Sequence, residues 1–412
     1  MHISSLNISL KDLWKASLFI YLVSYTAFSF SADLTWINTI LLYFFFAISI
    51  ISLLCIKDLK FNIYMVSMLC FLVVLIIGFL FSTSDYSFDF LYAFLVVCGI
   101  TLICTNYICT REDMLFIFKA LMIGGIVQNI YIFIYYGVDF FSMIVGGNRI
   151  GAVAGNLNEV GLRSCYSAIF AIFFAFNNSK TKQQKLGYFI VAVVCSFFAV
   201  ITASKKVLIL LIMGIVFNVI FNPNKKNSIN IKNNANKSIK IIISIILLAT
   251  LIALLSRVSF FSGMINRFVE FLDFIFKGEY NSSDNKRLSY ITKGIQVFLE
   301  NPILGEGTGA SYNHFGTYSH CNFVEILMNN GIVGFLSFYL VYVALVHGSY
   351  KKYKYSFGND KDYFSLFCVF LIMSILVLSI AMVYYNQIYY QVILAVIASN
   401  SFSVSISQQT NQ

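Results

Sequence analysis

The chain has 412 residues, of which 59% are hydrophobic and 11% are charged. A soluble domain carries about 25% charged and about 45–50% apolar residues, so a water-soluble chain of this composition could not cover its apolar surface. The composition therefore excludes a cytosolic enzyme, a secreted disulfide scaffold and a disordered protein, and it predicts an all-α polytopic membrane protein. The net charge of +10, from 28 Lys and Arg against 18 Asp and Glu, makes the position of each charge informative.

The chain contains about 12 apolar runs of the length that spans a bilayer. They lie near residues 14–32, 34–56, 61–82, 88–109, 114–136, 160–178, 186–204, 207–221, 239–256, 322–347, 363–384 and 387–404. No small-residue cleavage site follows the first run, so we expect a retained helix rather than a removed signal peptide. Most of the nine cysteines lie inside apolar runs without a CxxC pair, which is typical of buried small hydrophobes.

The basic residues predict the orientation. With the N-terminus in the cytoplasm, most Lys and Arg fall in inside segments, as the positive-inside rule requires, and short outside loops hold only Arg149, Lys205 and Lys206. The chain is then divided into N-terminal transmembrane helices (1–138), transmembrane helices with basic outer-face residues (139–256), a long external loop (257–320) and C-terminal transmembrane helices (321–412), with both termini in the cytoplasm.

The long external loop is expected to be structured. Over 260–277, polar residues recur at helical spacing on a very apolar helix, which suits the bilayer interface. A second helix is predicted to begin near residues 283–284, where Ser or Asp can cap it, and to end at Asn301–Pro302. A glycine-rich stretch then leads to His320. We therefore expect a functional site at the boundary between the membrane and water on the outer side.

A short list of polar residues on the outer face could carry chemistry: Arg149, Arg163, Lys205, Lys206, Arg287, His320 and Glu325. Each basic residue also has an explanation that involves no function. It could be a solvated loop charge, it could extend to the lipid headgroups, or, for Arg287, it could form an ion pair with Asp284. Glu325 lies one turn into an apolar helix and needs a partner, either His320 or a basic residue. The other histidines, His2, His314 and His347, have no comparable neighbours. No metal or cofactor is expected, because no cluster of ligands has the spacing for zinc or magnesium.

This set of residues suits a diphosphate. Arginine binds phosphate oxygens through paired donors and lysine adds a point charge. His320 is close to a helix N-terminus, where the dipole disfavours the imidazolium, so a neutral imidazole could take a proton from an attacking hydroxyl. The residues therefore indicate a glycosyl transfer with an anionic leaving group and no metal.

Two blocks, RLSYITKGIQVFLENPILGEGTG and SHCNFVEILMNNGIVGFLSF, resemble the shared core of bacterial O-antigen polymerases and O-antigen ligases. The matching residues are Arg287, Pro302, Gly305, Gly307, His320, Glu325, Gly331 and Gly334. Upstream, NRIGAVAGNLNEVG resembles a family segment that places Arg149 and Asn158, and TASKK resembles one that places Lys205, with Lys206 beside it. Three residues depart from the family pattern: Cys321 replaces Asn, Leu157 replaces Pro, and Lys205 replaces Arg.

The resemblance implies a polytopic glycosyltransferase fold in the bacterial inner membrane, with a periplasmic site. It also implies an undecaprenyl-diphosphate-linked oligosaccharide as donor, His320 as base, a diphosphate-binding role for the Arg and Lys residues, and supporting roles for Glu325 and Asn158. The polymerase is favoured over the ligase, which would transfer polymer to lipid A–core. A flippase or exporter is less favoured, because it needs polar residues lining a mid-membrane cavity. The expected partners are the lipid-linked saccharide, the bilayer and a chain-length regulator protein, with no nucleic acid.

Overall fold

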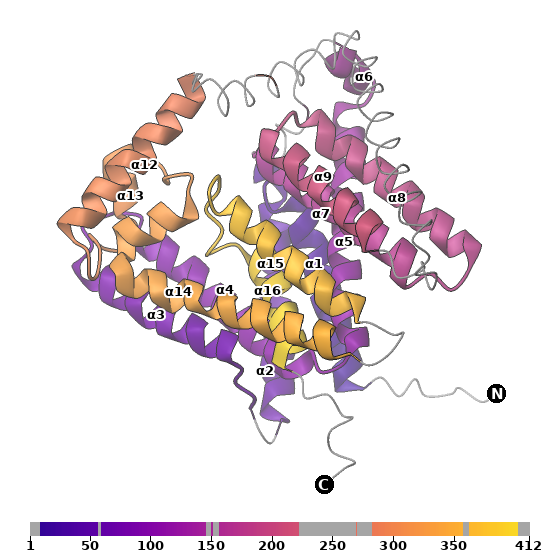
Figure 1. Ribbon diagram of the computed structural model, residues 1–412, viewed down its shortest axis with the longest axis horizontal. Helices are drawn as coiled ribbons and strands as arrows, with labels where there is room; N and C mark the ends of the chain where they lie inside the picture. Colours follow the sequence, from indigo (N-terminus) through magenta and orange to yellow (C-terminus); the bar gives the residue numbers. More distant parts are fainter. Residues whose placement is uncertain are drawn as a thin grey trace, which may run out of the picture. The chain divides into compact units, whose positions relative to one another are not determined.

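The computed structural model of the protein describes residues 9–56, 59–145, 150, 156–221, 269, 282–356 and 362–402. These residues form helices and connecting turns, with no strand among them (Figure 1). Seven helices of this part of the chain are long and apolar enough to cross a membrane. The prediction of an all-α polytopic membrane protein is therefore confirmed.

The helices follow the predicted spans closely. In chain order they are α1 (Leu10–Phe28), the short 3-10 helix η1 (Ala32–Leu34), α2 (Thr35–Leu54), α3 (Ile63–Phe81), α4 (Ser87–Tyr107), α5 (Arg111–Tyr136), α6 (Asp139–Val145), α7 (Leu157–Asn177), α8 (Lys182–Ile201), α9 (Lys205–Ile220), α12 (Ser282–Glu300), α13 (Ala310–Phe315), α14 (Asn322–Tyr355), α15 (Tyr363–Leu378) and α16 (Ile388–Phe402). Each predicted span except 239–256 coincides with one of them. That span, and nearly all of the predicted loop helix over 260–277, lie outside the described residues.

The second predicted loop helix is confirmed as α12. It ends as expected before Pro302, and the N–H of Asn301 donates back to the carbonyls of Val297 and Phe298 at 3.2 and 3.1 Å. Because proline cannot continue the hydrogen-bond ladder, the chain turns away at this point.

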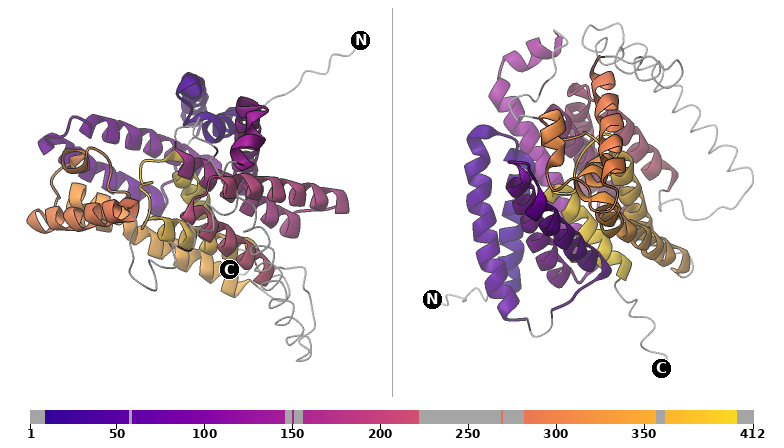
Figure 2. Two further views of the ribbon diagram at one scale, coloured as in Figure 1. Left: turned by 90° about the horizontal axis from the view of Figure 1, so that it is seen from above. Right: turned by 90° about the vertical axis from the view of Figure 1, so that its left-hand side faces the viewer.

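The chain divides into two compact units: unit 1 comprises residues 1–22, 39–120 and 281–412, and unit 2 comprises residues 23–38 and 121–280. In unit 1, α3 and α14 run antiparallel and side by side (Figures 1 and 2). At this interface the ring of Phe71 on α3 lies 5.1 Å from that of Phe338 on α14, and it also lies 5.1 Å from Phe94 on α4 and 5.8 Å from Tyr385 before α16. In unit 2, α7 is buried along almost its whole length, between α8 and α9.

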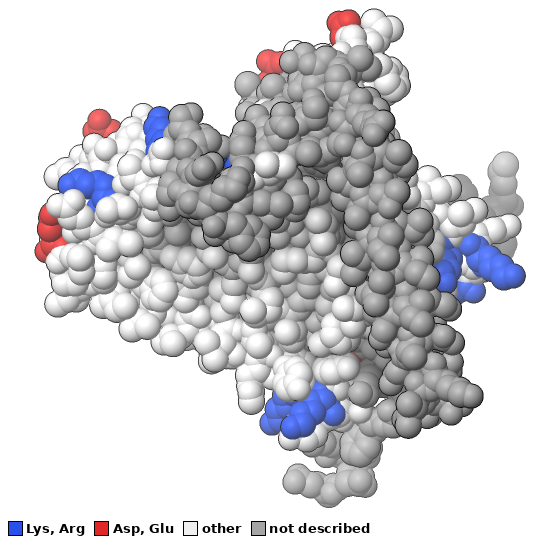
Figure 3. Space-filling view, turned by 45° about the horizontal axis from the view of Figure 1, so that its top comes forward, with Lys and Arg blue, Asp and Glu red and all other residues white. Residues whose placement is uncertain are grey.

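Two ends of unit 1 can be distinguished. At the end where α1, α5 and α15 begin, two ion pairs form: Lys15 and Asp113 are 2.6 Å apart, and Arg111 and Asp362 are 2.7 Å apart. The opposite end, where α3 stops and α14 begins, is called the loop end. On the face in Figure 3, the charged side chains of the described residues form small separate groups among uncharged side chains. Few charges are expected on the sides of helices that face lipid, where a charged side chain is costly.

Candidate functional site

The loop end is built on a break in α14. Gly331 has φ 62° and ψ −164°, which interrupts the helical ladder inside a long apolar helix. The turn 302–309 docks on this break through four backbone hydrogen bonds: Glu306 N–H to Met328 O (2.9 Å), Gly307 N–H to Asn329 O (3.0 Å), Ile332 N–H to Pro302 O (2.9 Å) and Val333 N–H to Ile303 O (3.2 Å). In a membrane, backbone groups freed by a broken helix must be paired within the protein. The turn supplies that pairing.

The motif glycines are needed for this docking. Gly305, Gly307 and Gly331 have φ of 72°, 116° and 62°, in the region that favours glycine. A Cβ on Gly305 would lie 2.5 Å from the carbonyl carbon of Asn329, and a Cβ on Gly331 would collide with the carbonyl oxygen of Ile303. The glycines that carry the family resemblance thus allow the turn and the broken helix to touch through their backbones.

Glu325 is fully buried in the first turns of α14 and holds three neighbouring segments together. Its carboxylate accepts hydrogen bonds from the Ser311 hydroxyl (2.6 Å), the Ser319 backbone N–H (2.7 Å) and the Asn329 side-chain amide (3.1 Å). The sequence predicts His320 or a basic residue as its partner; these three donors are neutral instead, and a partner role for His320 stays a prediction. A buried carboxylate is tolerated when several hydrogen bonds replace its water.

His320 stands in an unusual backbone conformation directly before α14. Its φ is 62°, in the left-handed region, which costs about 1–2 kcal/mol for a residue other than glycine. The half-buried imidazole lies edge-on to Tyr318 at 4.4 Å and parallel to Tyr290 at 6.2 Å, with 6° between the planes. The preceding residue, Ser319, is fixed by Glu325. Backbone strain of this kind concentrates at functional sites.

Arg287 reaches the same region from α12. It lies one turn before Tyr290 and on the same face of the helix, and its side chain is half-buried. The helix approaches α14 closely at Gly294, where a Cβ would collide with the Val324 side chain. Within the part of the chain that the structure describes, Arg287 makes no ion pair or hydrogen bond. A half-buried guanidinium without an acidic partner can bind an anion through paired donors.

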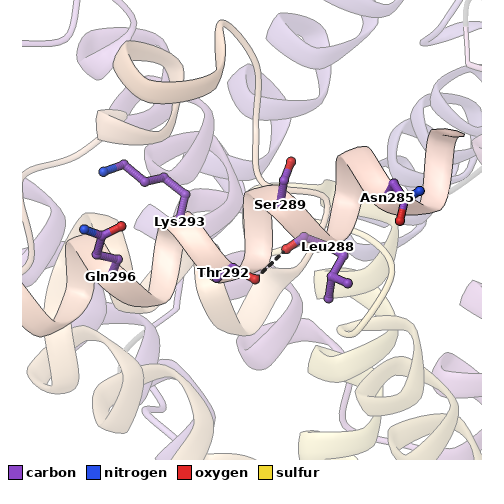
Figure 4. A pocket seen from close by; sticks show the side chains of 6 residues that line it. All are labelled: Asn285, Leu288, Ser289, Thr292, Lys293 and Gln296. Atoms are coloured by element: carbon purple, nitrogen blue, oxygen red, sulfur yellow. Dashed lines mark hydrogen bonds between the residues drawn. The ribbon is translucent and has the colours of Figure 1, made fainter. Parts of the chain in front are cut away.

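The other face of α12 is polar. Figure 4 shows Asn285, Leu288, Ser289, Thr292, Lys293 and Gln296 along a shallow hollow of about 430 Å³, with the Thr292 hydroxyl donating to the Leu288 carbonyl at 3.0 Å. All of these residues belong to one helix, so the hollow has no second wall among them. The helix therefore separates a polar outer face from the face that carries Arg287 and Tyr290.

In unit 2, Arg163 is 1% exposed and caps the end of α1. Its Nη1 donates to the carbonyls of Tyr25 and Thr26, each at 2.8 Å, and its guanidinium carbon lies 4.1 Å from the centre of the Phe30 ring. These contacts fix the side chain inside the unit. A role in diphosphate binding stays a prediction for this residue.

The remaining predicted residues also belong to unit 2. Lys205 and Lys206 are half-buried and begin α9, directly after Ala203 and Ser204, and Ala203 has φ 50°. Asn158 is in the first turn of α7, where its N–H donates to the capping Asn156 side chain at 3.1 Å. Arg149 lies outside the described residues. Arg287, His320 and Glu325 thus belong to unit 1. That they act together with Arg149, Arg163, Lys205 and Lys206 stays a prediction.

Sequence reasoning missed two features of the loop end. His314 has a close acidic neighbour after all, since its Nε2 lies 2.6 Å from Glu306 Oε2. Asn322 is fully buried and connects α14 to the segment before α16: its Oδ1 accepts from the N–H groups of Tyr384 and Tyr385 at 3.0 and 3.2 Å. The tyrosine-rich stretch next to NQ was the available signal for the second feature.

Cys321 occupies the position where the family pattern has Asn. The side chain is buried, and burial raises the pKa of its thiol, so the sulfur stays protonated at neutral pH. The amide chemistry of the usual Asn is present one residue later, in Asn322, but there it serves the contact with Tyr384 and Tyr385.

Comparison with known families agrees with the motif analysis. Residues 190–339 match the model of a family described as O-antigen ligase. The matched segment contains Lys205, Lys206, Arg287, His320 and Glu325, and it confirms the resemblance to the O-antigen polymerase and ligase family. No curated protein matches the chain.

Proposed function

We propose that the protein is an O-antigen or related surface-polysaccharide polymerase of the bacterial inner membrane. It joins undecaprenyl-diphosphate-linked repeat units by glycosyl transfer on the periplasmic side. The observation that carries the proposal is the geometry of the loop end: a strained His320 between two tyrosines, and, one turn from one of them, Arg287, which makes no ion pair or hydrogen bond with the described residues. The family match over this segment supports the same class of reaction.

The reaction uses His320 as a general base. A hydroxyl oxygen of the acceptor saccharide attacks the anomeric carbon of the donor, and the new glycosidic bond forms as the bond from that carbon to the diphosphate oxygen breaks. The electron pair leaves with undecaprenyl diphosphate, and the hydroxyl proton goes to the imidazole. An imidazole held by flanking rings and a fixed backbone is oriented before the acceptor arrives, which lowers the entropic part of the barrier.

The cations bind the leaving group. Arg287 provides paired donors to the diphosphate oxygens, and Arg149, Arg163, Lys205 and Lys206 are proposed as further diphosphate-binding residues. These side chains neutralise the negative charge that develops on the diphosphate as it leaves, so the proposed transfer needs no metal ion. Glu325 and Asn158 act as positioning residues, and a chain-length regulator protein is the proposed protein partner.

The ligase is the second candidate, and the description of the matched family favours it. Both enzymes break the same donor bond, but the ligase transfers finished polymer to lipid A–core. Deleting the gene and separating the polysaccharide on a gel distinguishes them. Core bearing a single repeat unit indicates a polymerase, whereas bare core with polymer held on the carrier lipid indicates a ligase.

The site itself is tested by replacing His320 and Arg287 separately with alanine. Both variants are expected to lose long-chain polysaccharide while inserting in the membrane at normal levels. Lys293→Ala, on the outer face of the same helix, is the matched control and should retain the wild-type ladder. Wild-type ladders from the His320 and Arg287 variants would refute the proposed roles.

A further inference from the structure

A carboxylate–imidazole pair lies at the loop end outside the proposed transfer chemistry. Glu306 Oε2 and His314 Nε2 are 2.6 Å apart, and their side chains are 32% and 26% exposed. Neither residue is among the matching motif residues, although Glu306 lies between two of them, Gly305 and Gly307. A carboxylate bonded to one imidazole nitrogen fixes the ring and leaves the other nitrogen to meet a ligand. In the part of the chain described by the structure, His314 makes no hydrogen bond besides that with Glu306.

Both members of the pair stand on rigid supports. The backbone N–H of Glu306 donates to the Met328 carbonyl in the broken segment of α14. His314 lies on α13, where the Ser311 hydroxyl donates to Glu325 Oε1 at 2.6 Å. Because the other oxygen of Glu325 accepts from the residue before His320, one buried carboxylate supports both histidine-bearing segments.

A row of rings joins the pair to His320. The ring of His314 lies 6.2 Å from Phe315, Phe315 stacks on Tyr290 at 4.6 Å, and Tyr290 lies 6.2 Å from His320. Beside the pair, the exposed Asn313 donates its side-chain N–H to the Thr83 hydroxyl at 3.0 Å. Partly exposed rings next to carboxylate, imidazole and amide groups suit a ligand with apolar C–H faces and many hydroxyls.

We propose that Glu306, His314 and Asn313 form a saccharide-binding subsite that holds hydroxyl groups of the acceptor saccharide while its reacting end is at His320. The inference rests on the proposed function, because it takes the saccharide of that reaction as its ligand. Hydroxyls donate to the Glu306 carboxylate and exchange hydrogen bonds with His314 and the Asn313 carbonyl. The subsite binds the saccharide and takes no part in proton transfer.

The test is a binding measurement on the purified full-length protein. The probe is the free oligosaccharide released by mild acid from the lipid-linked saccharide that accumulates in cells lacking this gene. Titration calorimetry is expected to give a Kd about tenfold higher for Glu306→Gln and for His314→Gln than for the wild type, since each loses a hydrogen bond to a charged or fixed group. Glu300→Gln, an exposed carboxylate at the end of α12, is the matched control and should bind as the wild type does.

The outcomes separate this inference from the proposed function. His320→Ala should retain saturable binding of the saccharide and transfer nothing. Wild-type Kd values for the Glu306 and His314 variants would overturn the subsite, and so would the absence of saturable binding to the wild-type protein. Binding without any transfer by the wild type would overturn the proposed function and leave the subsite standing. Asn313→Ala changes a more exposed side chain and should also raise the Kd, so it tests the subsite even if the Glu306 and His314 variants fail to fold.

Discussion

The turn before α14 and the turn before α9 share a backbone feature and differ in what holds it. His320 and Ala203 are the two non-glycine residues with positive φ in the described ranges, and each comes shortly before a helix that carries motif residues. The His320 turn is tied by Ser319 to Glu325, six residues further along. At the other turn, the Ala203 N–H donates to the Val200 carbonyl at the end of α8.

The two turns illustrate two different reasons for which a residue other than glycine adopts the left-handed conformation. At His320 a functional side chain is held in a costly conformation by a buried network, which is the arrangement expected where the imidazole itself is needed. At Ala203 the side chain is a methyl group that cannot react, so we attribute the conformation to the turn that leads the chain into α9. Replacing each residue with glycine, which adopts this conformation without strain, distinguishes the two reasons.

The largest effect is expected for His320→Gly. The change keeps the backbone geometry and removes the base, so the transfer rate should fall by about 100-fold or more. The rate is measured as polymer formed by purified protein from the lipid-linked saccharide. Ala203→Gly is the control, with a rate within about twofold of the wild type because no reacting group is lost. A wild-type rate in His320→Gly would show that its turn, like that of Ala203, only shapes the chain.

A second substitution tests whether the His320 turn depends on the broken helix. Gly331→Ala places a Cβ against the Ile303 carbonyl and should lower the free energy of unfolding by about 3 kcal/mol or prevent folding. Gly316→Ala is the matched control: its φ is 65°, but no atom lies within 4 Å of the added Cβ. Strain alone then predicts a loss of about 1 kcal/mol.

Unfolding of both variants is followed in detergent by circular dichroism. Equal losses for Gly331→Ala and Gly316→Ala would mean that the contact between the turn and the broken helix adds no stability. In that case the loop end would owe its stability to other contacts, such as the hydrogen bonds of Glu325.

Local sequence patterns predicted the features of the fold that depend on neighbouring residues, namely the apolar spans and the ends of helices. Hydropathy located the spans, and the residues around 283–284 and Pro302 located both ends of α12. The break at Gly331 was missed, because the surrounding residues remain apolar and a continuous helix has the same hydropathy. The docked turn, which begins nearly thirty residues upstream, pairs the backbone groups at the break.

The sequence predicted which residues belong to the candidate site, but not which hydrogen-bond partners they have. The resemblance identified His320, Arg287 and Glu325, but Glu325 bonds to Ser311 and Ser319, which carry no charge and give no signal in the sequence. Arg163 bonds to the carbonyls at the end of α1, more than a hundred residues away. Backbone carbonyls are present at every position, so no sequence pattern identifies which ones an arginine will reach.

The smallest expected effect is on the stability of Ala203→Gly. Relief of the left-handed strain gains about 1–2 kcal/mol, and the greater freedom of glycine in the unfolded chain removes about 0.5–1 kcal/mol of that gain. The variant should therefore unfold at a slightly higher denaturant concentration than the wild type, by an amount equivalent to about 0.5 kcal/mol. Destabilisation instead would mean that the Ala203 methyl group makes packing contacts worth more than the strain. The two turns would then be alike, each retaining a strained residue for its side chain.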